Sequence, residues 1–336
     1  MSRRTKRGDD EMNLNRRHWI AAAIALAISP LAGAQSAGDW PARPVRLIVP
    51  GPPAGGTDIL ARLLAEQLSK AFGKPFVIEN KPGANGMIGS ETVAHAAPDG
   101  HTLLFSYAGA MVVNPSLYVR ALDPLKSFEP IAQIGSFGNL LVVSPVLPVH
   151  NLRELADYAR KRPGELNYGT WGVGSGGHLT MEIFLQRAKV TMHHVPYKGA
   201  ASVATDVQGG TLPVGWTDVT SQIQQVRAGR LRALAVSGTS RLPQLPEVPT
   251  MSEQGYPFET TSWYGLFAPA RTPAAIVDRL NAEVNRIIAT PEFKARLAML
   301  NLPAAPTVSA AQFRNVVAKD TVAWRAVVQA AGVRPE

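Results

Sequence analysis

The stretch VRLIVPGPPAGGTD, residues 45–58, decides the fold expected of this chain. Its first part, Val45–Val49, is apolar and β-branched and predicts a short strand that the following prolines end. Gly55–Gly56 then permits a tight turn, and Thr57 or Asp58 is expected to cap a helix through ILARLLAEQLSKAF, whose apolar residues recur at helical spacing. The stretch therefore predicts a strand, a glycine turn and a helix in succession.

This arrangement has two possible meanings. The N-terminus of a helix exposes backbone N–H groups, and a carboxylate or phosphate can bind to them. The same pattern is also typical of an ordinary strand-to-helix turn that binds no ligand. Residues 45–58 alone leave both interpretations open.

The N-terminus has the pattern of a secretory signal peptide over residues 1–34. Six Arg or Lys residues precede an uncharged run from Trp19 to Leu31, and Ala32-Gly33-Ala34 forms a small-x-small cleavage site. The run is too short to span a membrane comfortably. Translation from Met12 instead of Met1 would give a more conventional basic region, and Arg16-Arg17 also permits twin-arginine export in place of the general secretion route. A periplasmic location is expected in either case.

Composition narrows the class of protein. The chain of 336 residues has 34 Lys or Arg, 25 Asp or Glu and no cysteine. Removing residues 1–34 leaves 28 basic and 22 acidic residues, a net charge of +6. Because the basic residues are scattered, nucleic-acid binding is not expected, whereas anions are plausible ligands. Without disulfides the fold depends on its core, and some 300 mature residues suffice for about two domains.

From Trp40 onward, apolar strands alternate with helices, which predicts an α/β fold with mostly parallel sheets. Residues 140–145 and 231–238 are further strands, whereas DPLKSFEPIAQIG, residues 123–135, has the character of a connection. Residues 272–300 form an amphipathic segment that is expected to pack on the first of two domains and not to touch a ligand. The apolar face of this segment consists of Ile276, Leu280, Val284 and Ile287.

A second glycine-rich turn, Gly172–Gly177, matches the dinucleotide motif G-x-G-x-x-G. A dinucleotide site also needs an acidic residue after the next strand, and VTMHHVPYKG contains none, so NAD binding is rejected. What remains is another helix N-terminus with exposed N–H groups and a hydroxyl from Thr170 or Ser175. This turn is a possible partner for the first one.

No signature of catalysis or metal binding emerges. His193 and His194 are neighbours on a predicted strand and point to opposite faces, so they cannot bind one ion. The chain lacks a G-x-S-x-G elbow and any cysteine nucleophile. No cofactor or metal is expected. Asp218 ends the predicted strand LPVGWTD, where it can face a ligand or cap the next helix through Ser221.

Many ordered blocks together resemble the Bug family, the extracytoplasmic solute receptors of tripartite tricarboxylate transporters. The resemblance runs from Trp40 to Gly332 and is carried by PGPPAGGTDILAR, ENKPGANGMIGSETVAHAAPDGHTLLFS, YGTWGVGSGGHLTMEIF, HVPYKGAASVATDVQGG and WYGLFAPARTPAAIVDRLNAEV. It implies a two-domain, type II-like periplasmic binding protein whose domains close on a small, usually carboxylated solute. Domain 1 would comprise residues 35–139 and 238–336 and domain 2 residues 140–237, with strands near 140–145 and 231–238 crossing between them.

The resemblance also implies a ligand site between the two domains. In such receptors the carboxylate is held largely by backbone groups and waters of the first domain, and side chains of the second domain give selectivity. Carried over by position, the ligand-binding residues are expected to be Pro53, Ala54, Gly55, Thr57, Asp58, Ser106, Tyr107, Thr170, Trp171, Gly172, Ser175 and Asp218.

The chain departs from the family pattern at three positions. Gly51 replaces an aromatic residue and Ala54 a glycine, so the pocket is expected to be larger or to be filled by another side chain such as Tyr107. Trp171 replaces a proline, and its indole could stack on an aromatic ligand or serve only as a lid. A solute bulkier than a small dicarboxylate, such as an aromatic acid, is the resulting hypothesis.

The function that follows is a monomeric receptor, not an enzyme, that delivers an organic acid to the membrane permease subunits of a tripartite tricarboxylate transporter. A receptor that senses its ligand and signals to a partner protein is the alternative. An exported hydrolase on a similar scaffold is a more remote one.

Overall fold

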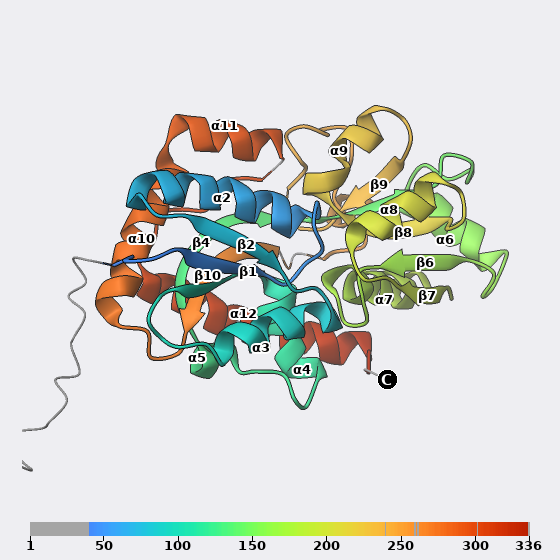
Figure 1. The fold of residues 1–336 in the computed structure, drawn as a ribbon. Helices are drawn as coiled ribbons and strands as arrows, with labels where there is room; N and C mark the ends of the chain where they lie inside the picture. Colours follow the sequence, from blue (N-terminus) through green and yellow to red (C-terminus); the bar gives the residue numbers. More distant parts are fainter. Residues whose placement is uncertain (1–39, 239, 259, 261, 301, 335–336) are drawn as a thin grey trace, which may run out of the picture. The chain divides into compact units, whose positions relative to one another are not determined.

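The computed structural model describes residues 40–238, 240–258, 260, 262–300 and 302–334, and the expected signal peptide lies outside them. Every element below belongs to the compact unit Pro41–Glu336. Two five-stranded sheets with flanking helices form this α/β unit (Figure 1). None of the described helices is long and apolar enough to span a bilayer.

The first sheet has the strand order β2-β1-β3-β10-β4. Its strands are β1 (Val45–Val49), β2 (Phe76–Asn80), β3 (Thr102–Tyr107), β4 (Phe128–Phe137) and β10 (Ser262–Pro269). Strands β2, β1 and β3 are parallel, and β10 runs antiparallel to both of its neighbours. The carboxyl ends of β1, β2 and β3 therefore meet at one edge of the sheet.

The second sheet has the order β7-β6-β8-β5-β9. Its strands are β5 (Asn139–Val143), β6 (Asn167–Thr170), β7 (His193–Pro196), β8 (Val214–Asp218) and β9 (Arg232–Val236). Strand β5 is antiparallel to β8 and β9, while β6 is parallel to β7 and β8. Each sheet is thus mostly parallel with one reversed strand.

Helices cover both faces of each sheet. Around the first sheet lie α2 (Gly56–Phe72), α3 (Met87–Ala94), α4 (Asn114–Leu117), α5 (Pro124–Ser127), α10 (Ala274–Ala289), α11 (Pro291–Met299) and α12 (Ala310–Ala331). Around the second lie α6 (Leu152–Arg160), α7 (Gly176–Ala188), α8 (Ala200–Gln208) and α9 (Val219–Arg227). Helices α2 and α3 lie on opposite sides of the first sheet (Figure 1). Shorter helical turns occupy Ala84–Gly86, Gly109–Val113 and Ser252–Gln254.

The burial of β5 explains its unbroken apolar sequence. Leu141 and Val143 pack in the cluster that contains residues of α6 and α7, whereas Leu140 and Val142 pack in the cluster with α8 and α9. Successive side chains of a strand point to opposite faces, so a strand covered on both faces needs an apolar residue at every position. The apolar face predicted for residues 272–300 lies in α10, and its residues Ile276, Leu280, Val284 and Ile287 are buried.

The chain passes between the sheets at two adjacent places. Only Gly138 separates β4 from β5, and Ser237 follows β9 directly. The Asn139 backbone N–H donates to Ser237 Oγ at 2.7 Å, and the Ser237 backbone N–H donates to the Asn139 carbonyl at 2.9 Å. The strands expected near 140–145 and 231–238 lie within the second sheet, next to these two passages.

Two local predictions were wrong. Residues 128–137 form the edge strand β4, although the sequence suggested a connection; Pro130 obscured the strand, and an edge position tolerates a missing N–H donor. Helix α2 begins at Gly56 with Gly55 as its N-cap, not with Thr57 or Asp58, and no side chain caps it. Asp58 instead accepts a hydrogen bond from the turn before the helix.

Candidate functional site

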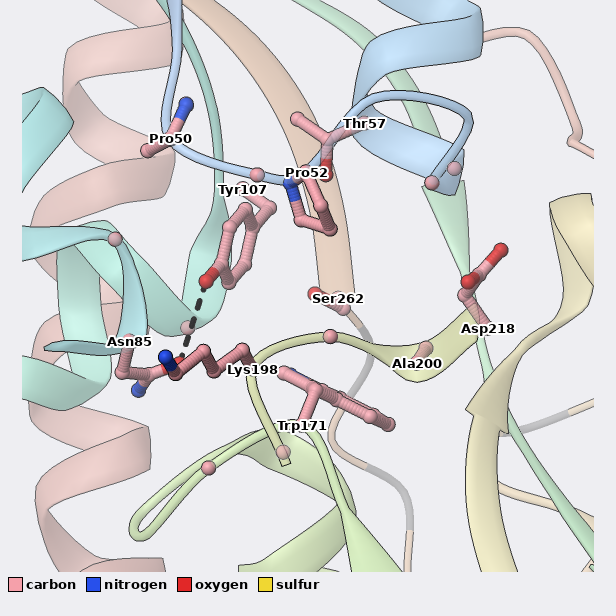
Figure 2. Close-up of a pocket in the computed structure, with 18 of the residues that line it drawn as sticks. Pro50, Pro52, Thr57, Asn85, Tyr107, Trp171, Lys198, Ala200, Asp218 and Ser262 are labelled. Atoms are coloured by element: carbon pink, nitrogen blue, oxygen red, sulfur yellow. Dashed lines mark hydrogen bonds between the residues drawn. The ribbon is translucent and has the colours of Figure 1, made fainter. Parts of the chain in front are cut away.

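A cavity of about 290 Å³ lies where loops from the two sheets meet (Figure 2). Its walls follow the carboxyl ends of six strands, the edge at which open α/β sheets bind ligands. Further walls come from β5, β10 and α12. Its main lining residues are Pro50–Pro52, Gly55–Thr57, Gly83–Gly86, Tyr107, Gly109, Tyr118, Asn139, Trp171–Val173, Gly176, Tyr197–Ala200, Asp218, Ser262, Tyr264 and Trp324.

The turn between β1 and α2 is held by the buried carboxylate of Asp58. Asp58 Oδ2 accepts from the Ala54 backbone N–H at 2.9 Å, and Oδ1 accepts from Asn80 Nδ2 at 2.9 Å. Ala54 has a φ of 61°, which is unfavourable for alanine. Burial opposes ionisation of Asp58, but the hydrogen bonds from Arg62, Ala54 and Asn80, with the Arg62 charge, hold its pKa below the usual value. The hydrogen bonds of Asp58 thus hold the turn in place.

The second turn, Gly83–Gly86, consists of four successive residues with positive φ. Asn85 lies at its centre, buried, and donates through Nδ2 to Asn114 Oδ1 at 2.8 Å. Asn114 Nδ2 in return donates to the Asn85 carbonyl at 3.0 Å, and Tyr107 Oη donates to Asn85 Oδ1 at 3.3 Å. Left-handed geometry in non-glycine residues persists only where surrounding contacts enforce it. These contacts fix the turn as one wall of the cavity.

The third loop, Thr170–Ser175, rests on the buried His178 and the half-buried His194. The Gly174 backbone N–H donates to His178 Nδ1 at 3.0 Å, and Thr170 Oγ1 is hydrogen-bonded to His194 Nε2 at 2.7 Å. Burial lowers the pKa of His178 to about 4, and burial with the neighbouring His178 lowers that of His194 to about 3. Both rings are therefore neutral at ordinary pH. His193, next in the strand, is exposed, so the two neighbours do point to opposite sides.

Loops of the first sheet approach loops of the second sheet closely at three places around the cavity. A Cβ built on Gly56 would lie 2.6 Å from Asp218 Oδ1, and one on Gly199 would lie 2.7 Å from Pro52 Cγ. Tyr118 Oη donates to the Val173 carbonyl at 3.0 Å. Loops so closely apposed form a cleft between the two sheets that is partly open to solvent.

The structure brings half of the expected site residues to the cavity wall. Among the twelve, Gly55, Thr57, Tyr107, Trp171, Gly172 and Asp218 line it. The others, Pro53, Ala54, Asp58, Ser106, Thr170 and Ser175, are not lining residues. Ser106, Thr170 and Ser175 are fully buried, and Ser175 caps α7 by accepting from the His178 backbone N–H. Direct ligand contact by any of the twelve stays a prediction.

Sequence reasoning missed several wall residues. Lys198 lies one residue before the close contact at Gly199, within the quoted block HVPYKG, and its positive charge was the signal that could have found it. Asn139, Tyr264 and Trp324 come from β5, β10 and α12. No local motif marks these three, because they reach the cavity only through the order of the strands and the packing of α12.

Known proteins with similar sequences cover nearly the whole chain. The sequence profile described as "Tripartite tricarboxylate transporter family receptor" matches residues 60–333. The UPF0065 protein in the tcbD-tcbE intergenic region of a Pseudomonas species is 37% identical over 326 residues, 95% of each chain. Protein BugT of Bordetella pertussis is 34% identical over 319 residues, 93% of this chain and 96% of BugT.

Two solved structures of Rhodopseudomonas palustris proteins are similar in fold and sequence. Rpa4515 with adipate superposes with a TM-score of 0.85 at 36% identity, over 89% of this chain and 100% of that one. MatC with bound malate gives a TM-score of 0.81 at 31% identity, over 86% of this chain and 100% of MatC. Adipate and malate are both dicarboxylates.

Proposed function

The chain belongs to the receptor family of tripartite tricarboxylate transporters, and on that premise we propose that it captures a small carboxylated organic anion in the cavity described above. The single observation that carries this proposal is the cavity of about 290 Å³ at the carboxyl ends of six strands. Its loops present backbone N–H groups and the ammonium of Lys198, which are groups that bind carboxylates. The adipate and malate bound by two similar proteins support the same ligand class.

The receptor works by closing two lobes on its solute. The first lobe is built from the chain before residue 139 and after residue 238, and the second from the segment between them. The adjacent passages at Gly138 and Ser237 support this division, because a short paired connection is a natural hinge. Closure would bring Gly56 to Asp218 and Pro52 to Gly199, as in the present arrangement.

The receptor acts in the periplasm as a monomer and hands its solute, unchanged, to the membrane permease subunits. It is not an enzyme. In support, the matching family is one of transporter receptors, and a similar solved structure is the periplasmic binding protein BugD. The two most perturbed histidines, His178 and His194, serve as supports beneath a loop and do not line the cavity.

A screen of organic acids by thermal shift tests the proposal. A saturating carboxylate at 100 times its Kd should stabilise the protein by about 2.7 kcal/mol. Mass spectrometry after prolonged incubation should recover the acid unchanged. Stabilisation by no carboxylate at millimolar concentration would contradict the binding proposal, and conversion of a stabilising acid into a product would contradict the receptor role.

A further inference from the structure

The charged side chains on the cavity wall lie at two opposite ends. Of the described lining residues, Lys198 alone carries a positive charge and Asp218 alone a carboxylate. Figure 2 shows the Lys198 side chain pointing toward Asn85 and away from Asp218, which lies on the opposite side of the cavity. The cavity is therefore polarised along its length.

At the first end, the groups favour an anion. Within the part of the chain that the structure describes, Lys198 forms no ion pair. It lies beside the turn Gly83–Gly86, whose backbone is fixed by Asn85 and Tyr107. A carboxylate placed here could pair with the Lys198 ammonium without breaking an ion pair inside the described part of the protein.

At the second end, the protein supplies its own carboxylate. Asp218 lies against the N-terminus of the 17-residue helix α2, with Oδ1 2.6 Å from a Cβ built on Gly56. The positive end of a helix dipole favours an anion, and here the anion is Asp218. A solute carboxylate placed at the same end would be repelled by Asp218, whereas a hydroxyl or ammonium group could donate to it.

The middle of the cavity is apolar and aromatic. Trp171 lies between the two ends in Figure 2. Tyr107 lies at the Lys198 end, where it donates to Asn85, and Tyr264 at the Asp218 end, where its Oη and Asp218 Oδ1 both lie within 3 Å of a Cβ built on Gly56. An aliphatic chain or an aromatic ring fits such a wall, because it buries apolar surface without leaving polar groups unpaired. The cavity volume suits a solute of roughly ten heavy atoms.

We propose that this cavity selects a solute with a carboxylate at the Lys198 end and a hydrogen-bond donor, a hydroxyl or ammonium group, at the Asp218 end. Solutes with carboxylates at both ends are disfavoured. The inference rests on the proposed function and narrows its ligand class. It separates this chain from the two similar proteins that bind adipate and malate.

Isothermal titration of two matched series tests the inference. The first series is hexanoate, 6-hydroxyhexanoate, 6-aminohexanoate and adipate, and the second is benzoate, 4-hydroxybenzoate, 4-(aminomethyl)benzoate and terephthalate. In at least one series, the acid with a donor group should bind about tenfold or more tighter than the dicarboxylate, because a charge-assisted hydrogen bond replaces a like-charge repulsion.

Variants of the two charged residues identify the cause of that preference. In Asp218→Asn, the affinities for the donor acid and for the dicarboxylate of a series should differ by no more than about threefold. In Lys198→Met, the affinity for every acid should fall about tenfold. Asp157→Asn and Lys126→Met are matched controls on exposed residues and should leave both affinities and ratios unchanged. Circular dichroism and thermal melts establish that each variant is folded.

The outcomes separate the two proposals. Binding of the dicarboxylates as tightly as the donor acids, or an unchanged ratio in a folded Asp218→Asn variant, would overturn the inference while the receptor function stands. Failure of all eight acids to bind the wild-type chain would count against the proposed function itself and against the inference that rests on it.

Discussion

The imidazole rings of His178 and His194 stack with their centroids 3.8 Å apart and their planes inclined by 13°. One ring comes from the first turns of α7 and the other from β7, and each is hydrogen-bonded to the loop Thr170–Ser175 that carries Trp171. Two imidazolium ions at this distance would repel each other in a largely desolvated position. The pair therefore supports the cavity wall only while both rings are neutral.

Stability should fall in acid because of this pair. The pKa of His178 is lowered to about 4 and that of His194 to about 3, from about 6.5 in the unfolded chain. Above pH 6.5 neither state takes up a proton. Below it the unfolded chain does and the folded one does not, so stability falls by up to about 1.4 kcal/mol per pH unit for each histidine. Urea unfolding at pH 7.5 and 5.0 measures the loss.

The double variant His178→Gln/His194→Gln should lose less stability than the wild type between those two pH values, whatever its stability at pH 7.5. His150→Gln, which changes an exposed histidine, should keep the wild-type difference. An identical pH dependence in the double variant and the wild type would refute the role of the stacked pair.

Gly56→Ala should obstruct the closed arrangement without unfolding the protein. The new Cβ would lie 2.6 Å from Asp218 Oδ1 and 2.8 Å from Tyr264 Oη, and overpacking of this kind costs about 1–3 kcal/mol. Because Gly56 begins α2, alanine is otherwise favourable there. Titration should show an affinity about tenfold lower for any bound acid. Gly209→Ala, at an open helix end, is the control and should bind normally.

Asp58→Asn should weaken the first turn. The substitution removes the charge that accepts hydrogen bonds from the Ala54 backbone and from Asn80, and Arg62 loses its ion pair. Loss of a buried charged acceptor should destabilise the protein by about 1–3 kcal/mol and weaken ligand binding through the displaced turn. Glu66→Gln breaks only exposed pairs, with Lys70 and Arg296, and should leave stability close to that of the wild type. Equal effects of both substitutions would contradict this assignment.

Gly138→Ala should strongly destabilise the passage between the sheets. A Cβ on Gly138 would collide with the carbonyl oxygen of Ser237, a backbone atom that cannot move away alone. We expect a loss of about 2 kcal/mol or more, measured by urea unfolding. Gly51→Ala, whose Cβ would meet only ordinary contacts at 3.6 Å, should unfold like the wild type. A wild-type midpoint for Gly138→Ala would show that the two passages are not closely paired.

Trp171 should report ligand binding by fluorescence. It is partly exposed on the cavity wall, whereas Trp216 and Trp263 are at most 1% exposed. A bound acid should change the emission of the wild type, and Trp171→Phe should abolish most of the change while calorimetry still detects binding. Trp263→Phe, away from the cavity, should keep it. Persistence of the full signal in Trp171→Phe would show that the ligand does not contact Trp171.

The sequence correctly predicted the elements whose determinants are local. An apolar β-branched run makes a strand, Gly55 and the glycines at 172–174 lie in turns that precede helices, and a period of 3.6 residues makes an amphipathic helix, all from contacts within a few residues. Ordered sequence blocks also sufficed to recognise the receptor family, which the comparisons confirm. The local pattern gave a wrong prediction at β4, because Pro130 made this edge strand resemble a connection.

Which residues share the cavity was decided only by the tertiary structure. Asn139 and Trp324 line the same cavity as Trp171 because of strand order and the packing of α12, and no local motif marks either residue. Thr57 faces the cavity, whereas Asp58 turns beneath it to support Ala54. Lys198 and Asp218 lie at opposite ends of the cavity because the loop after β7 and the end of β8 are placed there by the fold. Long-range packing sets these distances, so the sequence alone determined the kind of protein, and the folded chain determined the polarity of its cavity.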